Sequence, residues 1–96
     1  MAVLTRAEIE RTLAELDGWS CDGAAISKEF TFAGFPEAIA FVNRLVPDAE
    51  AADHHPDITV SYRRVRVSFT THSEGGITRK DVVGAAAVER RAHEAT

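Results

Sequence analysis

The alternation of apolar residues between Asp57 and His72 constrains the fold more than any other feature of the chain. Apolar residues occupy every second position on both sides of Arg63, but they change from even to odd numbers there: Ile58, Val60 and Tyr62, then Val65, Val67 and Phe69. A single flat strand would put half of them on the wrong face, because strand side chains alternate between faces. The segment therefore predicts two strands joined by a two-residue turn at Arg63-Arg64, although a bulge there would change the phase equally well.

The register of this predicted hairpin has a consequence for the histidines. A turn at Arg63-Arg64 makes Tyr62 the partner of Val65, so Tyr62 is expected to pack with the apolar residues. Extended outward, the same register places His55 opposite His72 at the open end of the hairpin, on the polar face. His54 lies next to His55 in the chain. Three histidines are therefore expected to converge.

Three helices are predicted from capping signals and apolar spacing. The Thr5-Arg6-Ala7-Glu8 capping box begins a first helix that extends to about Leu16. A second helix begins at Phe35-Pro36-Glu37, because proline suits the first helical position and an acid suits the first turn. At Pro47 this helix either bends or gives way to a short new turn that reaches Asp53. A capping pattern at Thr78 begins a third helix that extends to about Ala92.

The remaining segment predicts a second hairpin. The extended segments Trp19-Ser20-Cys21 and Ala25–Phe32 flank Asp22-Gly23, which is a strong short hairpin signal. Trp19 and Phe35 could stack on a flat heterocycle, but both are expected in the core, because large aromatic side chains are usually buried. The order α-β-β-α-β-β-α predicts a single α+β domain over residues 1–96, in which helices pack on one face of a four-stranded antiparallel sheet.

Charge and composition exclude several classes of protein. The 96 residues contain 11 Lys and Arg against 15 Asp and Glu, a formal charge of −4, so direct binding of nucleic acid is not expected. No apolar segment approaches the roughly 20 residues that cross a membrane, and we expect a cytoplasmic protein. Cys21 is the only cysteine, which excludes an internal disulfide; it is expected to be a half-buried apolar residue.

The histidines are the candidates for chemistry. Imidazole can give and take protons near neutral pH, so His54, His55 and His72 in one site suit general acid–base catalysis. Pro56 stiffens the histidine pair, because the residue before a proline stays extended. Three imidazoles can also hold zinc, but the chain has no second ligand motif that completes a standard zinc site.

Two carboxylates are expected near these histidines. Glu50 lies about one helical turn before His54 and could orient that ring, or it could be a solvated helix residue. Asp81 is the fourth residue of Thr78-Arg79-Lys80-Asp81, so its role could be confined to capping the third helix.

Together these residues resemble the signature of a known family. The spacing Glu50-x3-His54-His55-Pro56-x5-Tyr62-x9-His72-x8-Asp81 is similar to that of the pterin-4a-carbinolamine dehydratases, whose animal members also act as dimerisation cofactors of a homeodomain transcription factor. The resemblance extends to other parts of the chain, namely Gly18-Trp19, Phe30-Thr31-Phe32, Phe35, Arg44 and Thr71. Two positions depart from the family pattern, because Ile58 replaces a common aromatic residue and Pro47 interrupts a helix that is usually continuous.

The resemblance implies an activity and a set of roles. It implies that His54, His55 and His72 bind a 4a-hydroxytetrahydropterin and dehydrate it to quinonoid dihydropterin and water, in the recycling of tetrahydrobiopterin. By the same resemblance His54 and His72 are the base and the acid, in an order that stays open, and His55 positions the pterin. Glu50, Thr71 and Asp81 would orient the histidines or contact the substrate. The reaction requires no metal and no organic cofactor.

The resemblance also implies an assembly and leaves two alternatives. Members of the family are tetramers, and a chain of this size buries only about 60–65% of its unfolded surface, so a homodimer or homotetramer is expected. One alternative is a non-catalytic dimerisation or regulatory module on the same fold. The other is a paralogue that acts on a pterin related to molybdopterin.

Overall fold

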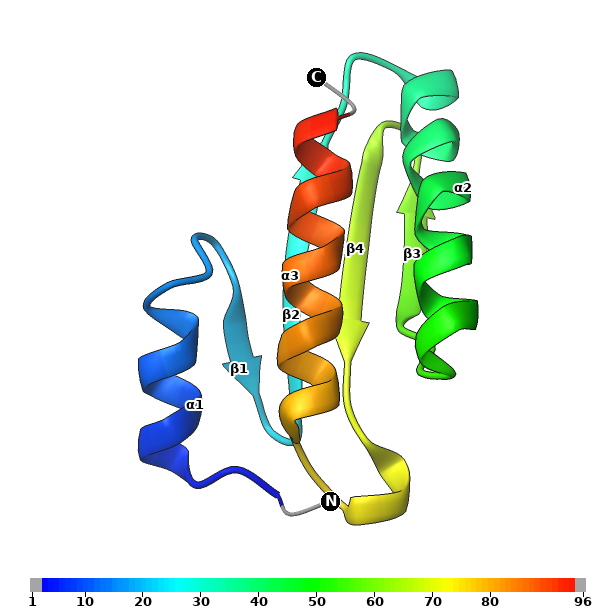
Figure 1. Ribbon diagram of the computed structural model, residues 1–96. Helices are drawn as coiled ribbons and strands as arrows, with labels where there is room; N and C mark the ends of the chain where they lie inside the picture. Colours follow the sequence, from blue (N-terminus) through cyan, green and yellow to red (C-terminus); the bar gives the residue numbers. More distant parts are fainter. Residues whose placement is uncertain (1–2, 95–96) are drawn as a thin grey trace.

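The sheet and the helices form two layers (Figure 1). The computed structural model describes residues 3–94, and its elements follow the predicted order. They are α1 (Arg6–Leu13), β1 (Ser20–Asp22), β2 (Ala25–Thr31), α2 (Phe35–Ala52), β3 (Asp57–Ser61), β4 (Arg64–Phe69), the short 3₁₀ helix η1 (His72–Glu74) and α3 (Arg79–Glu94). Within residues 3–94, no helix combines the length and apolar character that a membrane span requires. The predicted α+β fold is confirmed.

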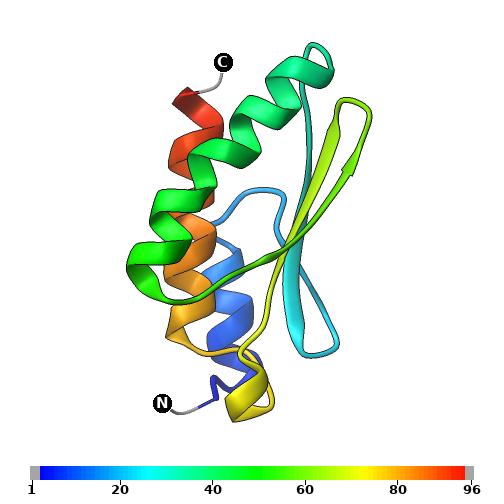
Figure 2. The ribbon, with the colours of Figure 1, turned by 90° about the vertical axis from the view of Figure 1, so that its right-hand side faces the viewer.

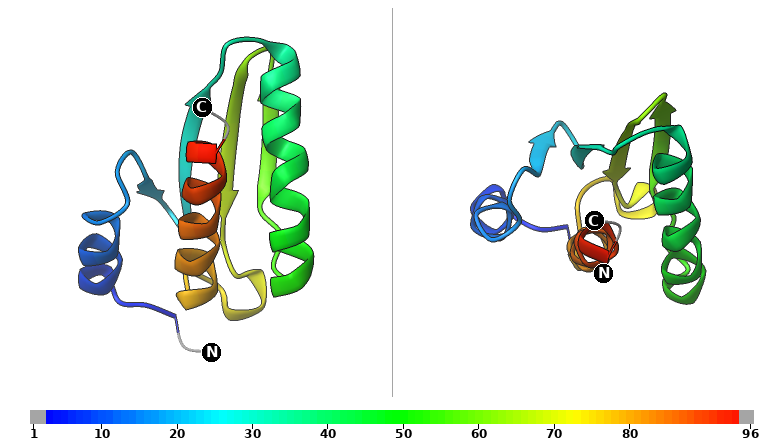
Figure 3. Two further views of the ribbon diagram at one scale, coloured as in Figure 1. Left: turned by 45° about the horizontal axis from the view of Figure 1, so that its top comes forward. Right: turned by 90° about the horizontal axis from the view of Figure 1, so that it is seen from above.

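All three helices lie on the same face of the sheet (Figures 2 and 3). The strands are antiparallel in the order β1-β2-β4-β3, so the two hairpins meet along β2 and β4. The residues that face the helices form the core: Trp19, Ile26, Phe30, Val65, Val67 and Phe69 on the sheet side, and Ala38, Phe41, Leu45, Ala85 and Val88 on the helix side. The opposite face is polar, as predicted, and there Arg66 Nη2 donates to Ser27 Oγ across 3.0 Å.

The predicted change of phase is present in the second hairpin, but the turn lies one residue earlier than expected. Ser61 pairs with Arg64, so the turn is Tyr62-Arg63, and Ile58 pairs with Val67. Tyr62 has a positive φ of 55° and is 68% exposed, so the prediction that it packs in the core was wrong. The new register differs from the predicted one by an even number of residues, so the apolar residues within β3 and β4 stay on the expected face.

This register contradicts the pairing that was expected to bring His55 opposite His72. Strand β4 ends at Phe69, and His72 belongs to η1 beyond it. A shift of one residue in the turn moves the register partner of His55 by two positions, so His72 no longer lies opposite His55. The histidines are therefore positioned by other contacts.

Other predicted details also need adjustment. The capping box at Thr5 and Glu8 is present, but α1 ends at Leu13 instead of Leu16. The first hairpin turns at Gly23-Ala24, one residue after the expected pair, because Asp22 pairs with Ala25. Trp19 is buried as expected, whereas Phe35 is 51% exposed, and Cys21 is exposed instead of half-buried.

Pro47 lies inside a continuous α2 and does not begin a new turn. A proline removes the amide that would bond the carbonyl four residues earlier, here that of Asn43. Both Pro47 and Asn43 are exposed, so this carbonyl is on the solvent side of the helix. Water can therefore satisfy it, and α2 extends to the segment that carries the histidines.

A polar contact fixes α3 against the first hairpin. Glu89 Oε1 accepts hydrogen bonds from Trp19 Nε1 at 2.8 Å and from Lys28 Nζ at 2.6 Å. Lys28 Nζ also donates to the carbonyl of Asp17 at 2.7 Å. The indole is 5% exposed, and burial makes a donor costly unless it is paired. This contact therefore fixes the position of α3.

Close packing between α3 and β4 requires glycine at position 84. A Cβ on Gly84 would lie 2.6 Å from Cε1 and 2.7 Å from Cζ of Phe69. The Phe69 ring has little freedom to move, because it is 3% exposed and packs against Trp19 and His54.

We expect Gly84→Ala to destabilise the fold, although alanine is the better helix former by about 1 kcal/mol. Overpacking of a well-packed core costs about 1–3 kcal/mol, so the net change should lower the urea midpoint. In a Phe69→Leu background, which shortens the obstructing ring, the same substitution should cost less. An equal cost in both backgrounds would show that the contact with Phe69 is not the cause.

Candidate functional site

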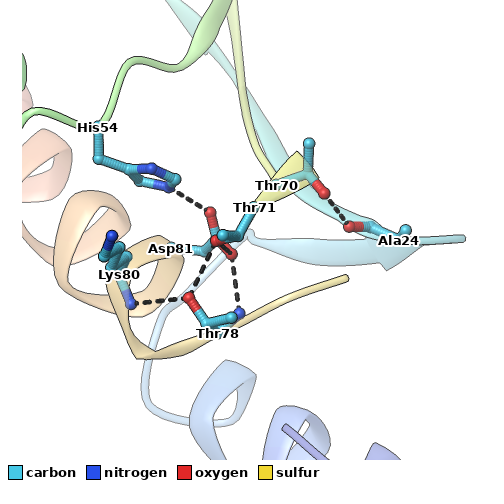
Figure 4. Close-up of polar contacts among 7 residues, drawn as sticks. All are labelled: Ala24, His54, Thr70, Thr71, Thr78, Lys80 and Asp81. Carbon is cyan, nitrogen blue, oxygen red and sulfur yellow. Dashed lines mark hydrogen bonds and ion pairs between the residues drawn. The ribbon is translucent and has the colours of Figure 1, made fainter. Parts of the chain in front are cut away.

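The buried carboxylate of Asp81 is the centre of the site (Figure 4). Its side chain is fully buried, and three polar groups surround it. Thr71 Oγ1 and the Thr78 amide donate to Oδ2, each at 2.8 Å, and Nε2 of His54 lies 2.6 Å from Oδ1. Burial of a charge requires this degree of pairing. Asp81 therefore caps α3, as one interpretation of the sequence expected, and it also contacts a histidine.

The end of α2 brings His54 to this carboxylate. Asp53 adopts the left-handed conformation, with φ 50° and ψ 43°. The His54 amide then donates back to the carbonyl of Ala49 at 3.2 Å, which closes the helix in the manner of a Schellman motif. Aspartate is among the residues that tolerate this conformation. The turn directs His54 away from the helix axis and towards the beginning of α3.

The His54 ring is held on one side and accessible on the other. Its side chain is 12% exposed, and the ring stacks on Phe69 with a centroid distance of 5.9 Å and an interplanar angle of 19°. Nδ1 makes no hydrogen bond to the described residues. Among those residues the only fully buried side-chain nitrogen or oxygen without a partner is Arg44 Nε, so Nδ1 of His54 reaches accessible surface.

Glu50 contacts His55 instead of His54, contrary to the spacing argument. Glu50 Oε2 lies 2.5 Å from His55 Nε2, and both side chains are more than half exposed. The expected contact assumed that the helix continues to His54, but α2 ends at Ala52. The turn at Asp53 instead brings His55, the residue after His54, over Glu50.

His72 and Thr71 have different environments although they are adjacent. Thr71 is buried and contacts Asp81, whereas His72 is exposed on η1. The structure thus joins His54, Thr71 and Asp81 in one network and His55 with Glu50 in a second contact. His72 is next to the first network in the chain but shares none of its hydrogen bonds.

An apolar cavity of about 340 Å³ opens between α2 and α3 beside His54. Its wall includes His54, Pro56 and Phe69, together with small residues of both helices, and Lys80 and Arg90 also line it. A cavity of this size and character suits a small, flat heterocycle. Within residues 3–94 no three His, Cys, Asp or Glu side chains lie close enough together to hold a metal ion.

An ion pair joins the two helices that form this cavity. Arg91 Nε donates to Asp48 Oδ2 at 2.9 Å, and Arg91 Nη2 donates to Oδ1 at 3.2 Å. The hydrogen bonds from Arg91 hold the pKa of the Asp48 carboxyl below its ordinary value of 3.8, against the opposing effect of burial. The charges of Arg91 and Arg90 act in the same direction.

Comparisons with known proteins agree on one family. The profile described as "Pterin 4 alpha carbinolamine dehydratase" matches residues 2–91. A crystal structure described as transcriptional coactivator/pterin dehydratase from Brucella melitensis superposes with a TM-score of 0.89 at 39% identity, covering 94% of this chain and 98% of that one. The chain belongs to the pterin-4a-carbinolamine dehydratase family.

Curated relatives within the pterin-4a-carbinolamine dehydratase family are similar over most of their length. One from Trichormus variabilis, named "Putative pterin-4-alpha-carbinolamine dehydratase", is 47% identical over 92% of this chain and 95% of its own. One of the same name from Thermosynechococcus vestitus is 53% identical over 82% of this chain and 83% of its own. A pterin dehydratase-like protein identified as a RuBisCO assembly factor shares the fold, with a TM-score of 0.63 at 21% identity.

Sequence reasoning missed two residues of the site in this dehydratase-family chain. Phe69 was assigned only to the core, yet it also supports the His54 ring. Thr78 was assigned only to a helix cap, yet its hydroxyl lies 2.9 Å from that of Thr71. The signal for Thr78 was present in the capping pattern, but its contact with Thr71 depends on the loop between β4 and α3.

Asp48→Asn should reduce stability in a pH-dependent manner. The pKa of Asp48 is lower in the folded state than in the unfolded chain, so its contribution is complete above about pH 4–5 and is lost as the pH falls further. We expect a loss of about 1 kcal/mol or less at pH 7, and a difference from wild type that shrinks steadily as the pH falls below about 4. Urea unfolding across this pH range measures both.

The matched control is Glu10→Gln, which removes the exposed ion pair between Arg6 and Glu10 on α1. This pair is largely solvated, so its loss should change the unfolding free energy very little at any pH. A loss for Asp48→Asn that persists unchanged in acid would contradict the assigned role of the carboxylate.

Proposed function

We propose that this chain dehydrates a 4a-hydroxytetrahydropterin to quinonoid dihydropterin and water, as part of pterin recycling. The observation that carries the proposal is His54, an imidazole held by a buried carboxylate at the wall of an apolar cavity, in a chain of the dehydratase family. The identity of the substrate as 4a-hydroxytetrahydrobiopterin, the action of the protein as a homodimer or homotetramer, and a cytoplasmic location belong to the same proposal.

The chemistry requires one proton to leave and another to arrive. The N5–H bond of the substrate breaks, and its electron pair forms the double bond between N5 and C4a. The C4a–O bond breaks, and the departing hydroxide takes up a proton to become water. Imidazole suits both transfers near neutral pH, and such transfers by positioned side chains accelerate reactions by about 10²–10⁴-fold.

The proposal gives each histidine a separate role, and the contacts of His54 and His55 support theirs. His54 exchanges a proton with the substrate, because it combines a carboxylate partner with an accessible nitrogen. His72 supplies the complementary proton transfer from the exposed η1 segment that follows Thr71, and His55 positions the pterin with Glu50 as its partner. Which of His54 and His72 is the acid stays open in this proposal.

Replacement of the two proton-transfer histidines should reduce the dehydration rate. We expect His54→Ala and His72→Ala each to lower kcat for a 4a-hydroxytetrahydropterin by about 10²-fold or more. His72 is exposed, so His72→Ala should leave the urea midpoint nearly unchanged, whereas His54→Ala removes a partner of the buried Asp81 carboxylate and should lower it. Circular dichroism should show that both variants are folded under the conditions of the assay. The rate of loss of the 4a-hydroxy compound in a stopped-flow absorbance assay measures the effect.

The matched control is His93→Ala. This histidine is exposed on α3, where its ion-pair partner is Glu89, and it lies outside the site. Its replacement should leave kcat within about twofold of wild type. If wild type does not accelerate the reaction, or if His54→Ala and His72→Ala are as active as His93→Ala, the proposed function is wrong.

A further inference from the structure

The hydrogen bonds around Asp81 fix the direction of each proton in the network. An ionised carboxylate only accepts, so the single hydroxyl proton of Thr71 points to Asp81 Oδ2 at 2.8 Å. Thr71 then has no proton for Thr78, and its oxygen must accept from the Thr78 hydroxyl at 2.9 Å. The Thr78 oxygen in turn accepts from the Lys80 amide at 3.2 Å.

The resulting chain of donors runs in one direction. It begins at the Lys80 amide, passes through the hydroxyls of Thr78 and Thr71, and ends at Asp81 Oδ2, which also accepts from the Thr78 amide. Thr71, Thr78 and Asp81 are all buried, with Thr78 and Asp81 at 0% exposure. Water therefore cannot readily replace a missing partner, and each link depends on the next.

The direction of this chain determines the tautomer of His54. With Oδ2 occupied by two donors, Oδ1 is left as an acceptor for His54 Nε2 at 2.6 Å. A neutral imidazole carries one proton, so a proton on Nε2 leaves Nδ1 with a lone pair. Nδ1 is also the nitrogen that forms no hydrogen bond to a described residue and that reaches accessible surface.

We propose that the Thr78–Thr71–Asp81 chain holds neutral His54 as the Nε2–H tautomer, which makes Nδ1 the nitrogen that exchanges a proton with the substrate and Thr78 a positioning residue. The assignment of Nδ1 to catalysis rests on the proposed function. The tautomer itself does not, because the hydrogen bonds of the protein alone determine it. Nitrogen NMR therefore tests the structural part separately from activity.

The first experiment measures the tautomer in the wild-type protein. Long-range ¹H–¹⁵N correlation spectra at a pH where the imidazole is neutral should show His54 Nε2 as protonated and Nδ1 as unprotonated. A His54→Gln variant identifies the signals. If Nδ1 carries the proton instead, the proposal is overturned, because Asp81 would then have to donate to His54.

The second experiment removes the Thr78 hydroxyl and keeps its shape. Thr78→Val preserves the backbone donor to Asp81 but removes the donor to Thr71 and the acceptor for the Lys80 amide. We expect kcat to fall by about tenfold with little change in KM, since a loosened Asp81 misplaces His54. The His54 signals should also show a mixture of tautomers.

Thr78→Ser is the matched control, because it retains the hydroxyl and should keep kcat within about twofold of wild type and the His54 tautomer unchanged. Thr71→Val removes the next donor in the chain and should alter the same signals, which provides a second measurement if Thr78→Val does not fold. Unchanged kcat and unchanged His54 signals in either folded valine variant would overturn the role of the hydroxyl chain.

The outcomes separate this inference from the proposed function. Suppose that the protein has no dehydratase activity, that its His54 is the Nε2–H tautomer, and that the valine variants lose this preference. The hydroxyl chain would then be supported and the proposed function would be wrong. If the protein is active but His54 is the Nδ1–H tautomer, the proposed function would be supported and the role of the hydroxyl chain would be wrong.

Discussion

The site depends on one requirement, namely that a fully buried carboxylate needs a donor at each oxygen. Asp81 obtains its donors from three separate segments: His54 after α2, Thr71 after β4, and Thr78 immediately before α3. Removal of any one of them would leave a buried lone pair unmatched, which costs more than the hydrogen bond itself contributes. The arrangement of the two helices and the end of the sheet is therefore coupled to the protonation and orientation of a single histidine.

The fold could be predicted from local patterns because these patterns tolerate small errors. Alternation of apolar residues identifies the buried face of a strand whatever its partner, and a register shift of two leaves that face unchanged. The turn itself was misplaced because Arg63-Arg64 and Tyr62-Arg63 are both unfavoured pairs, and nothing local shows that Tyr62 adopts positive φ. The capping signals at Thr5 and Thr78 were reliable because each is satisfied within four residues of chain.

The site was predicted less well than the fold because its contacts are long-range. His54 and Asp81 are separated by 27 positions, and their contact depends on where α2 ends. Because Asp53 adopts the left-handed conformation, Glu50 contacts His55 instead of His54. Helical spacing cannot predict this, because it assumes that the helix continues. The residue types and the predicted hairpin register indicated acid–base chemistry at the three histidines, and the family resemblance gave their individual roles. The pairing of carboxylates with histidines came only from the three-dimensional structure.

The closure of α2 at Asp53 also concerns the dynamics of the protein. The last turn of a helix is where local opening requires the least free energy, and His54 is tied to this turn through the hydrogen bond that its backbone amide donates to the carbonyl of Ala49. Fraying of that one turn would release His54 from Asp81 and His55 from Glu50 while the sheet and its core stayed intact. The site can thus be dismantled by a local fluctuation far smaller than unfolding.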